Sequence, residues 1–112
     1  MDSKRKCTTI VQAALLSFTL LILYPSEARA QGGESLYKTK CVACHGADGK
    51  GETAIGKANK LRDFASADVQ KQSDDELSGV ISAGKGKMPA YGKSLKAEQI
   101  KDLVTYIRTF KK

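Results

Sequence analysis

Apolar side chains recur at helical spacing near the C-terminus of the chain. Four of them follow the i, i+3, i+4, i+7 pattern that places side chains on one helix face, and they are Ile100, Leu103, Val104 and Ile107. Phe110 follows about one turn later. The pattern predicts an amphipathic helix that starts near Lys96 and packs this face against a core.

A second helix is predicted from its start signal. Ser73 and Glu76 stand three residues apart, which is the spacing of a capping box. Three apolar residues that follow share one helix face, and they are Leu77, Val80 and Ile81. Gly84 is a natural stop for this helix because glycine readily takes the conformation that ends one.

The rest of the chain is predicted to be a short helix and long loops. The helix covers residues 33–40, and the segments 46–51 and 84–92 are rich in Gly and Lys and indicate loops. Residues 53–72 have no clear period, but Leu61 and Phe64 are candidates to anchor them to a core. No run alternates between apolar and polar residues as a half-buried strand would. The sequence therefore predicts an all-α domain of several short helices joined by long loops.

The N-terminus has the three parts of a secretory signal peptide. Residues 4–6 are basic, residues 10–24 form an apolar stretch, and Ala28-Arg29-Ala30 provides an A-x-A cleavage site. A transmembrane anchor is the alternative, but a spanning helix needs about 20 apolar residues and this stretch is shorter. The sequence thus predicts a cleaved signal peptide over residues 1–30 and one exported domain over residues 31–112.

Composition adds a constraint on how this domain is held together. The chain of 112 residues has a net charge of +7, one His and three Cys, and Cys7 is expected to leave with the signal peptide. A small domain buries little apolar surface, and Cys41 and Cys44 are too close in sequence to staple it with a disulfide. Something other than a disulfide framework must support the core. The single His also excludes any centre that needs two.

The segment Cys41-Val42-Ala43-Cys44-His45 supplies the candidate chemistry. C-x-x-C-H is typical of c-type haem attachment, because two thiols at this spacing reach two vinyl groups and the next His can bind the iron. A zinc site is an alternative, but it needs further ligands, and no other Cys or His follows Ala30. A thioredoxin-like dithiol needs a βαβ setting, and no strand is predicted. The motif therefore predicts one haem c, bound through two thioethers, whose iron cycles between Fe²⁺ and Fe³⁺.

Met88 is the candidate for the remaining axial position of that iron. It is the only methionine after the predicted cleavage site. Methionine is more often a core filler, but a Gly/Lys-rich loop is a poor place for a core side chain. Pro89 follows directly and stiffens the segment that would present the sulfur.

Cys41–His45, followed some forty residues later by Lys87-Met88-Pro89-Ala90-Tyr91, resembles the class I c-type cytochromes. These are the small monohaem proteins of bacterial periplasm and of the photosynthetic lumen. Over residues 33–110 the resemblance includes Gly33, Tyr37 and Tyr106, which match the crossing of the first and last helices in that family. It implies a cytochrome c fold wrapped around one covalently attached haem.

The resemblance also implies a role for each site residue. Cys41 and Cys44 would form the thioethers, His45 would be the proximal ligand and Met88 the distal ligand. In the family, the second ring nitrogen of the proximal His donates to a carbonyl near a proline. This chain has no proline between His45 and Pro89, so a carbonyl near residues 54–56 is expected instead.

Two further expectations concern residues at the edge of the site. The family often begins its last helix with a Ser or Thr cap; Lys96 occupies that place here, so Ser94 is expected to serve instead. The haem propionates need donors, for which Asn59, Lys60 and Arg62 are candidates, with simple exposed polar residues as the alternative.

The function implied is that of a soluble one-electron carrier between membrane-bound or periplasmic redox partners, and not that of an enzyme. His and Met would fill both axial positions of the iron, whereas an enzyme such as a haem peroxidase needs an open one. A haem-based ligand sensor is a third interpretation, and it would have to release Met88. The resemblance places the exported protein in a bacterial periplasm, with a thylakoid lumen as the alternative.

The placement of charge predicts the kind of partner. Residues 83–97 contain four lysines and no acid, Lys85, Lys87, Lys93 and Lys96, and Lys38 and Lys40 lie just before the attachment motif. These residues predict a lysine rim that steers a monomer to acidic docking surfaces of an oxidase, a reaction centre or a cytochrome reductase. Lysines that only keep the protein soluble are the alternative. Nucleic-acid binding is not expected because stacking aromatics are missing among the basic residues, and no membrane insertion is expected after cleavage.

Overall fold

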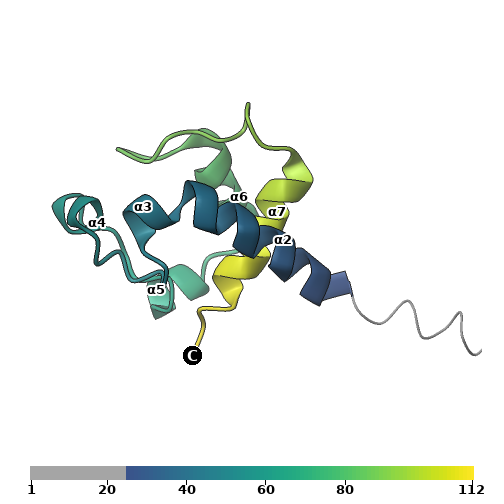
Figure 1. The fold of residues 1–112 in the computed structure, drawn as a ribbon, viewed down its shortest axis with the longest axis horizontal. Coiled ribbons are helices and arrows are strands. Elements are labelled where there is room, and N and C mark those ends of the chain that lie inside the picture. Colours follow the sequence, from purple (N-terminus) through teal and green to yellow (C-terminus); the bar gives the residue numbers. More distant parts are fainter. Residues whose placement is uncertain (1–24) are drawn as a thin grey trace, which may run out of the picture.

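The computed structural model describes residues 25–112, in which the chain forms six helices and no strand (Figure 1). The helices are α2 (Pro25–Lys40), α3 (Val42–His45), α4 (Ala54–Ala58), α5 (Ala67–Gln70), α6 (Asp74–Ala83) and α7 (Ala97–Arg108). The predicted all-α class is confirmed. The basic start and the apolar stretch of the predicted signal peptide lie outside the described residues. Within those residues no helix is long and apolar enough to cross a membrane.

The first helix is longer than the sequence pattern predicted. α2 begins at Pro25 and not near residue 33, so the predicted cleavage point after Ala30 lies inside it. Proline is tolerated in the first helical turn, where its missing N–H has no partner to lose. Glu27 lies in the first turn, where the helix dipole favours an acid, and Ala28 to Ala30 are good helix formers.

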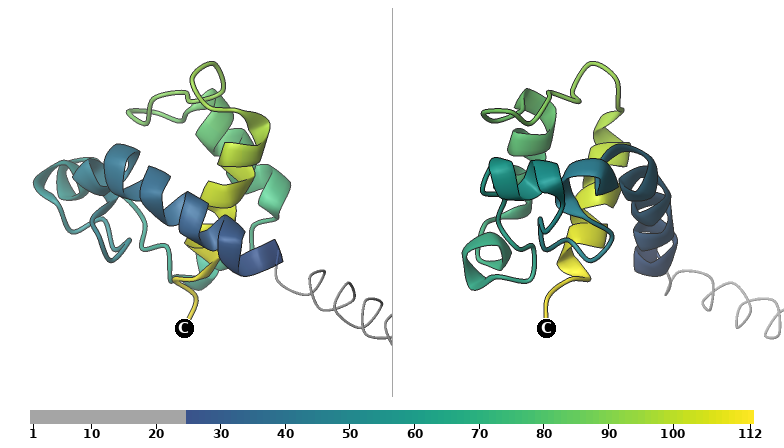
Figure 2. Two further views of the ribbon diagram at one scale, coloured as in Figure 1. Left: turned by 45° about the vertical axis from the view of Figure 1, so that its right-hand side comes forward. Right: turned by 60° about the vertical axis from the view of Figure 1, so that its left-hand side comes forward.

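Helices α2 and α7 cross at Gly33, where their backbones come close together (Figure 2). A Cβ atom at Gly33 would overlap the backbone carbonyl of Asp102 and lie 2.9 Å from the Cβ of Tyr106. Only glycine permits this approach, because it has no side chain. Next to the crossing, the rings of Tyr37 and Tyr106 lie 5.2 Å apart between their centroids. The predicted crossing of the first and last helices is confirmed.

The predicted apolar face of α7 forms the centre of the core. Its members Ile100, Leu103, Val104 and Ile107 are all buried, and Phe110 packs against them. On α6, Leu77 and Ile81 are buried as predicted, whereas Val80 is only partly buried because it faces a cavity.

The helix caps are partly as predicted. The Ser73 hydroxyl accepts from the Glu76 N–H, the Glu76 carboxylate accepts from the Ser73 N–H, and Gly84 follows the last residue of α6 with a φ of 74°. The expected role of Ser94 is wrong. Lys96 occupies the cap position of α7, where its N–H donates to the Gln99 side chain at 2.9 Å, while the Ser94 hydroxyl donates to the Tyr91 carbonyl.

Residues 53–72, which showed no clear period, form two short helices and their connecting loops. Arg108 fastens this region to the end of α7: its guanidinium donates to the carbonyls of Gln70 and Gln72 and contacts the carboxylate of Asp74 at 2.8 Å. The sequence of this segment carries only a weak helical signal. Such long-range contacts help to hold it in place, because tertiary packing can override local helix propensity.

Replacing Gly33 with Ala tests the close crossing. We expect Gly33→Ala to destabilise the holoprotein by about 1–3 kcal/mol, because the new methyl group forces α2 and α7 apart. The matched control is Gly79→Ala on α6, where an added Cβ has no atom within 4 Å. That substitution should stabilise the protein by about 0.5–1 kcal/mol, since alanine is the better helix former. Denaturant unfolding followed by circular dichroism measures both, and equal effects would contradict the tight contact.

Candidate functional site

A cavity of about 420 Å³ opens between α6, α7 and the loops that follow α4 and α6. Its volume lies within the range of pockets that bind small molecules and cofactors. Six aliphatic residues of its wall come from three helices, α5, α6 and α7, and they are Val69, Leu77, Val80, Ile81, Leu103 and Ile107. A small core thus surrounds a space that side chains alone do not fill.

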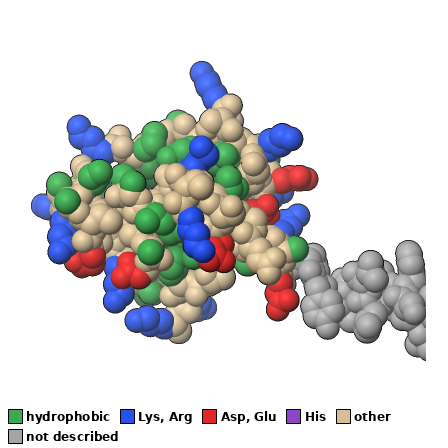
Figure 3. All heavy atoms as spheres, in the orientation of Figure 1, with side chains coloured by type: hydrophobic (Ala, Val, Ile, Leu, Met, Phe, Trp, Pro, Cys, Tyr) green, Lys and Arg blue, Asp and Glu red, His purple; other side chains and the backbone are tan. Residues whose placement is uncertain are grey.

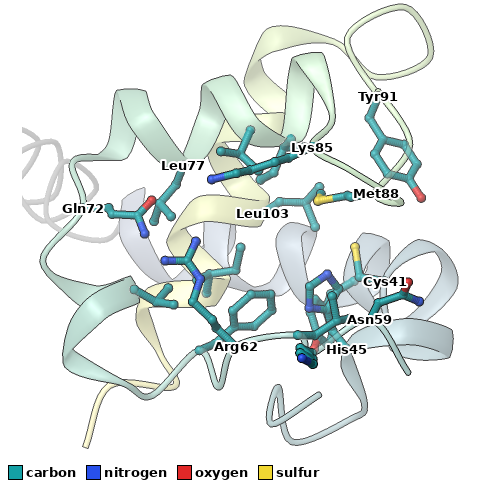
Figure 4. A pocket seen from close by; sticks show the side chains of 18 residues that line it. Cys41, His45, Asn59, Arg62, Gln72, Leu77, Lys85, Met88, Tyr91 and Leu103 are labelled. Carbon is teal, nitrogen blue, oxygen red and sulfur yellow. The ribbon is translucent and has the colours of Figure 1, made fainter. Parts of the chain in front are cut away.

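Three of the four predicted site residues line this cavity. In Figure 4, His45 lies on one wall and Met88 on the opposite wall, and Cys41 lies beside the gap between them. Cys44 lines a smaller adjoining cavity that it shares with Cys41, His45 and Met88. Cys41 and Cys44 are both free thiols, as attachment of a cofactor through them requires.

The attachment motif forms a single helical turn. Cys41 precedes α3, and its carbonyl accepts from the N–H groups of Cys44 and His45 at 3.2 and 2.9 Å. This turn places Cys41 and His45 on the wall of the same cavity. Burial raises the pKa of the Cys41 thiol to about 11, so the sulfur is protonated at neutral pH.

The imidazole of His45 is held by stacking. Its ring lies nearly parallel to that of Phe64, with 4.6 Å between centroids and 22° between planes. Burial lowers the pKa of His45, which favours the neutral form that binds metals. The sequence indicated Phe64 only as a candidate core anchor, because nothing in the sequence shows that Phe64 meets His45.

The expected hydrogen bond from His45 to a carbonyl near residues 54–56 is not formed. Its Nδ1 is buried and has no partner among the described residues. Two carbonyls of that segment, those of Ile55 and Gly56, accept instead from the backbone N–H groups of Asn59 and Leu61. These carbonyls, which the sequence suggested as acceptors for His45, are therefore used by hydrogen bonds within α4 and the turn that follows it.

The far end of the cavity is polar and basic. In Figure 4, the side chains of Arg62 and Lys85 approach one another there, near Gln72 and away from Cys41. Asn59 and Lys60, which the sequence also suggested, line the same cavity. Gln72 was not predicted as a site residue, and Lys85 was predicted only as part of the lysine rim, because only the course of two loops brings them to this end.

These features fit a haem attached through its vinyl edge. The thiols lie near one end of an apolar cavity, the cations lie at the opposite end where propionates would point, and an imidazole and a thioether face each other across it. Haem c therefore fits the residues present. When bound, it supplies a metal that gains and loses one electron.

The family comparison agrees with this geometry. Residues 28–107 match the family model described as "Cytochrome C oxidase, cbb3-type, subunit III". The chain belongs to this cytochrome c family, and within it to the small class I c-type cytochromes that transfer electrons through a covalently bound haem.

Two sequence relatives and one solved structure support this assignment. The chain is 31% identical over 107 residues to cytochrome c6 of Gloeothece citriformis, covering 92% of each chain. It is 36% identical over 83 residues to the cbb3-type cytochrome c oxidase subunit CcoP of Rubrivivax gelatinosus, which is 73% of this chain but only 26% of that protein. The solved structure of the KustC0563 c-type cytochrome superimposes with a TM-score of 0.67 and 38% identity, over 71% of this chain and 98% of that one.

Proposed function

We propose that this cytochrome is a soluble carrier in which His45 and Met88 are the two axial ligands of a haem attached through Cys41 and Cys44. The observation that carries the proposal is the arrangement of Cys41, His45 and Met88 around one apolar cavity, although Met88 comes from a distant loop. A thioether ligand favours the ferrous state and raises the reduction potential.

As ligands of the iron, the two side chains would leave no axial position for oxygen or a substrate. This supports a carrier and argues against an enzyme that works at the iron. The apolar wall would restrict water around a bound haem, so its surroundings would rearrange little on transfer of one electron. The same features argue against a ligand sensor, which would have to displace Met88.

Export to a bacterial periplasm, or to a thylakoid lumen, is part of the proposal. It rests on the signal-peptide pattern of residues 1–30 and on the use of paired thiols for haem attachment. Mass spectrometry of the purified protein gives the mature N-terminus, which we place at Gln31.

We further propose that lysines beside the smaller cavity direct the protein to acidic surfaces of its redox partners. Lys40 and Lys87 line that cavity together with both thiols, and both are exposed. Lys93 and Lys96 are exposed but line neither cavity, and Lys38 pairs with Glu34 at 2.6 Å. Figure 3 shows basic side chains projecting around the edge of one face and apolar side chains within it, while acidic side chains lie along its lower and right-hand edge.

We also propose that Lys85 and Arg62 hold the propionate carboxylates. Both line the polar end of the cavity, and each offers donors to a carboxylate. Lys85 lies three residues before Met88, so the same contact would help to keep the loop of the distal ligand closed.

Met88→Ala tests the ligand assignment. The wild-type protein should give a pyridine haemochrome spectrum of haem c and, when ferric, a near-infrared charge-transfer band from methionine ligation. In the variant we expect covalent haem to remain and this band to disappear. The reduction potential should fall on the order of 0.1 V, because the axial ligand strongly sets it. Carbon monoxide should bind the reduced variant faster than the wild type, and an unchanged band would contradict the assignment.

Electron transfer to hexacyanoferrate(III), an anionic oxidant, tests the role of the lysines. We expect its rate to fall several-fold between low ionic strength and about 0.15 M salt, where the Debye length is about 8 Å. Lys87→Glu should slow the reaction more than Lys101→Glu, which changes the net charge equally but lies on α7 outside both cavities. Equal effects of the two variants would show that only net charge matters.

Lys85→Gln tests the propionate contact. We expect the reduction potential to fall by tens of millivolts and to depend more strongly on pH, because a cation near the carboxylates is lost. The control is Lys87→Gln in the same loop, since Lys87 does not line the large cavity. Protein-film voltammetry at several pH values compares them, and identical curves for the two variants would refute the contact.

A further inference from the structure

Three consecutive backbone carbonyls around His45 each accept a hydrogen bond from another segment. The Cys44 carbonyl accepts from the Thr53 hydroxyl at 2.6 Å, and the His45 carbonyl accepts from the Gly51 N–H at 2.8 Å. The Gly46 carbonyl accepts from the Tyr37 hydroxyl at 2.6 Å. The end of α3, which would otherwise leave its last carbonyls unpaired, is thus held from several directions.

Thr53 makes this contact while it caps α4. Its hydroxyl oxygen accepts from the Gly56 N–H at 2.8 Å and donates its proton to the Cys44 carbonyl. The two helices are close here, since a Cβ atom at Gly56 would lie 2.7 Å from the Cys44 oxygen. One hydroxyl therefore joins the start of α4 to the end of the attachment motif.

Tyr37 reaches the other side of His45 from α2. Its side chain is only 1% exposed, and its ring packs against those of Phe64 and Phe110. The hydroxyl reaches the carbonyl of Gly46, where the chain turns with a φ of 79°. A phenylalanine would fill the same core position, so the hydroxyl has a role that packing does not explain.

We propose that the hydroxyls of Thr53 and Tyr37 are positioning groups that hold the backbone of His45 from both sides and so fix how its imidazole meets the haem iron. This inference rests on the proposed role of His45 as an axial ligand. The Nδ1 atom has no acceptor among the protein groups described, so the placement of the ring depends on its backbone and on stacking with Phe64. The two hydroxyls bond the carbonyls of the residues on either side of His45 in the chain, so both act on its backbone.

Substitutions at Thr53 separate the hydrogen bond to the Cys44 carbonyl from the cap of α4. Thr53→Ser keeps both bonds, whereas Thr53→Asp keeps an acceptor for the Gly56 N–H but cannot donate to the Cys44 carbonyl when ionised. Thr53→Val removes both bonds at nearly constant shape, and Tyr37→Phe removes the second hydroxyl alone. The control is Thr39→Val, because the Thr39 hydroxyl bonds only carbonyls of its own helix, at residues 35 and 36.

The probe is nitric oxide, which binds the reduced holoprotein by displacing Met88 and then weakens the bond to the ligand on the opposite side, His45. Electron paramagnetic resonance then gives the ratio of five-coordinate to six-coordinate complex, which reports release of His45. We expect this ratio to rise about two- to tenfold in Thr53→Asp, Thr53→Val and Tyr37→Phe, which is the size expected for one lost hydrogen bond. Thr53→Ser and Thr39→Val should keep the wild-type ratio.

Two outcomes would overturn the inference. One is a wild-type ratio in both Thr53→Asp and Tyr37→Phe. The other is a rise in Thr39→Val as large as theirs, since this would indicate general loss of stability. Denaturant unfolding of each variant measures stability separately. Failure of the ligand assignment itself is distinct: His45→Gly would then bind haem with the wild-type absorption spectrum.

Discussion

The close crossing of α2 and α7 at Gly33 is the constraint on which the rest of the structure depends. It brings the end of α2, and with it Cys41, against the core that includes the buried face of α7. The aromatic rings of Tyr37, Tyr106 and Phe110 then close one side of the core. A larger residue at the crossing would push α2 away from α7 and so shift the attachment motif relative to Met88.

The core of this chain is built to include a cofactor. Its buried side chains surround a cavity of about 420 Å³, and several residues of the wall, Val80 and Met88 among them, are only partly buried. A covalently attached haem would complete this core in a way that a disulfide between Cys41 and Cys44 cannot. Structural support and electron transfer thus depend on the same group.

The site has different chemistry at its two ends and on its two faces. Thiols lie near one end and cations lie at the other, so an amphipathic plate can enter in one orientation. On one face, His45 comes from a motif that neighbouring segments hold through three carbonyls. On the other face, Met88 comes from the loop after α6. The Tyr91 hydroxyl in this loop donates to the Lys40 carbonyl at the end of α2.

The sequence by itself determined the helical class, the cap of α6, the buried face of α7 and the haem attachment motif, because each depends on residues close together in the chain. Only the tertiary structure decided what lies next to His45. Phe64 and Thr53 come from loops whose course depends on long-range packing, and Tyr37 reaches the Gly46 carbonyl from α2. The carbonyls expected as acceptors for His45 are used within α4 and the turn that follows it. The basic end of the cavity arises in the same way, because Arg62 and Lys85 come from two loops far apart in the chain that line the same cavity.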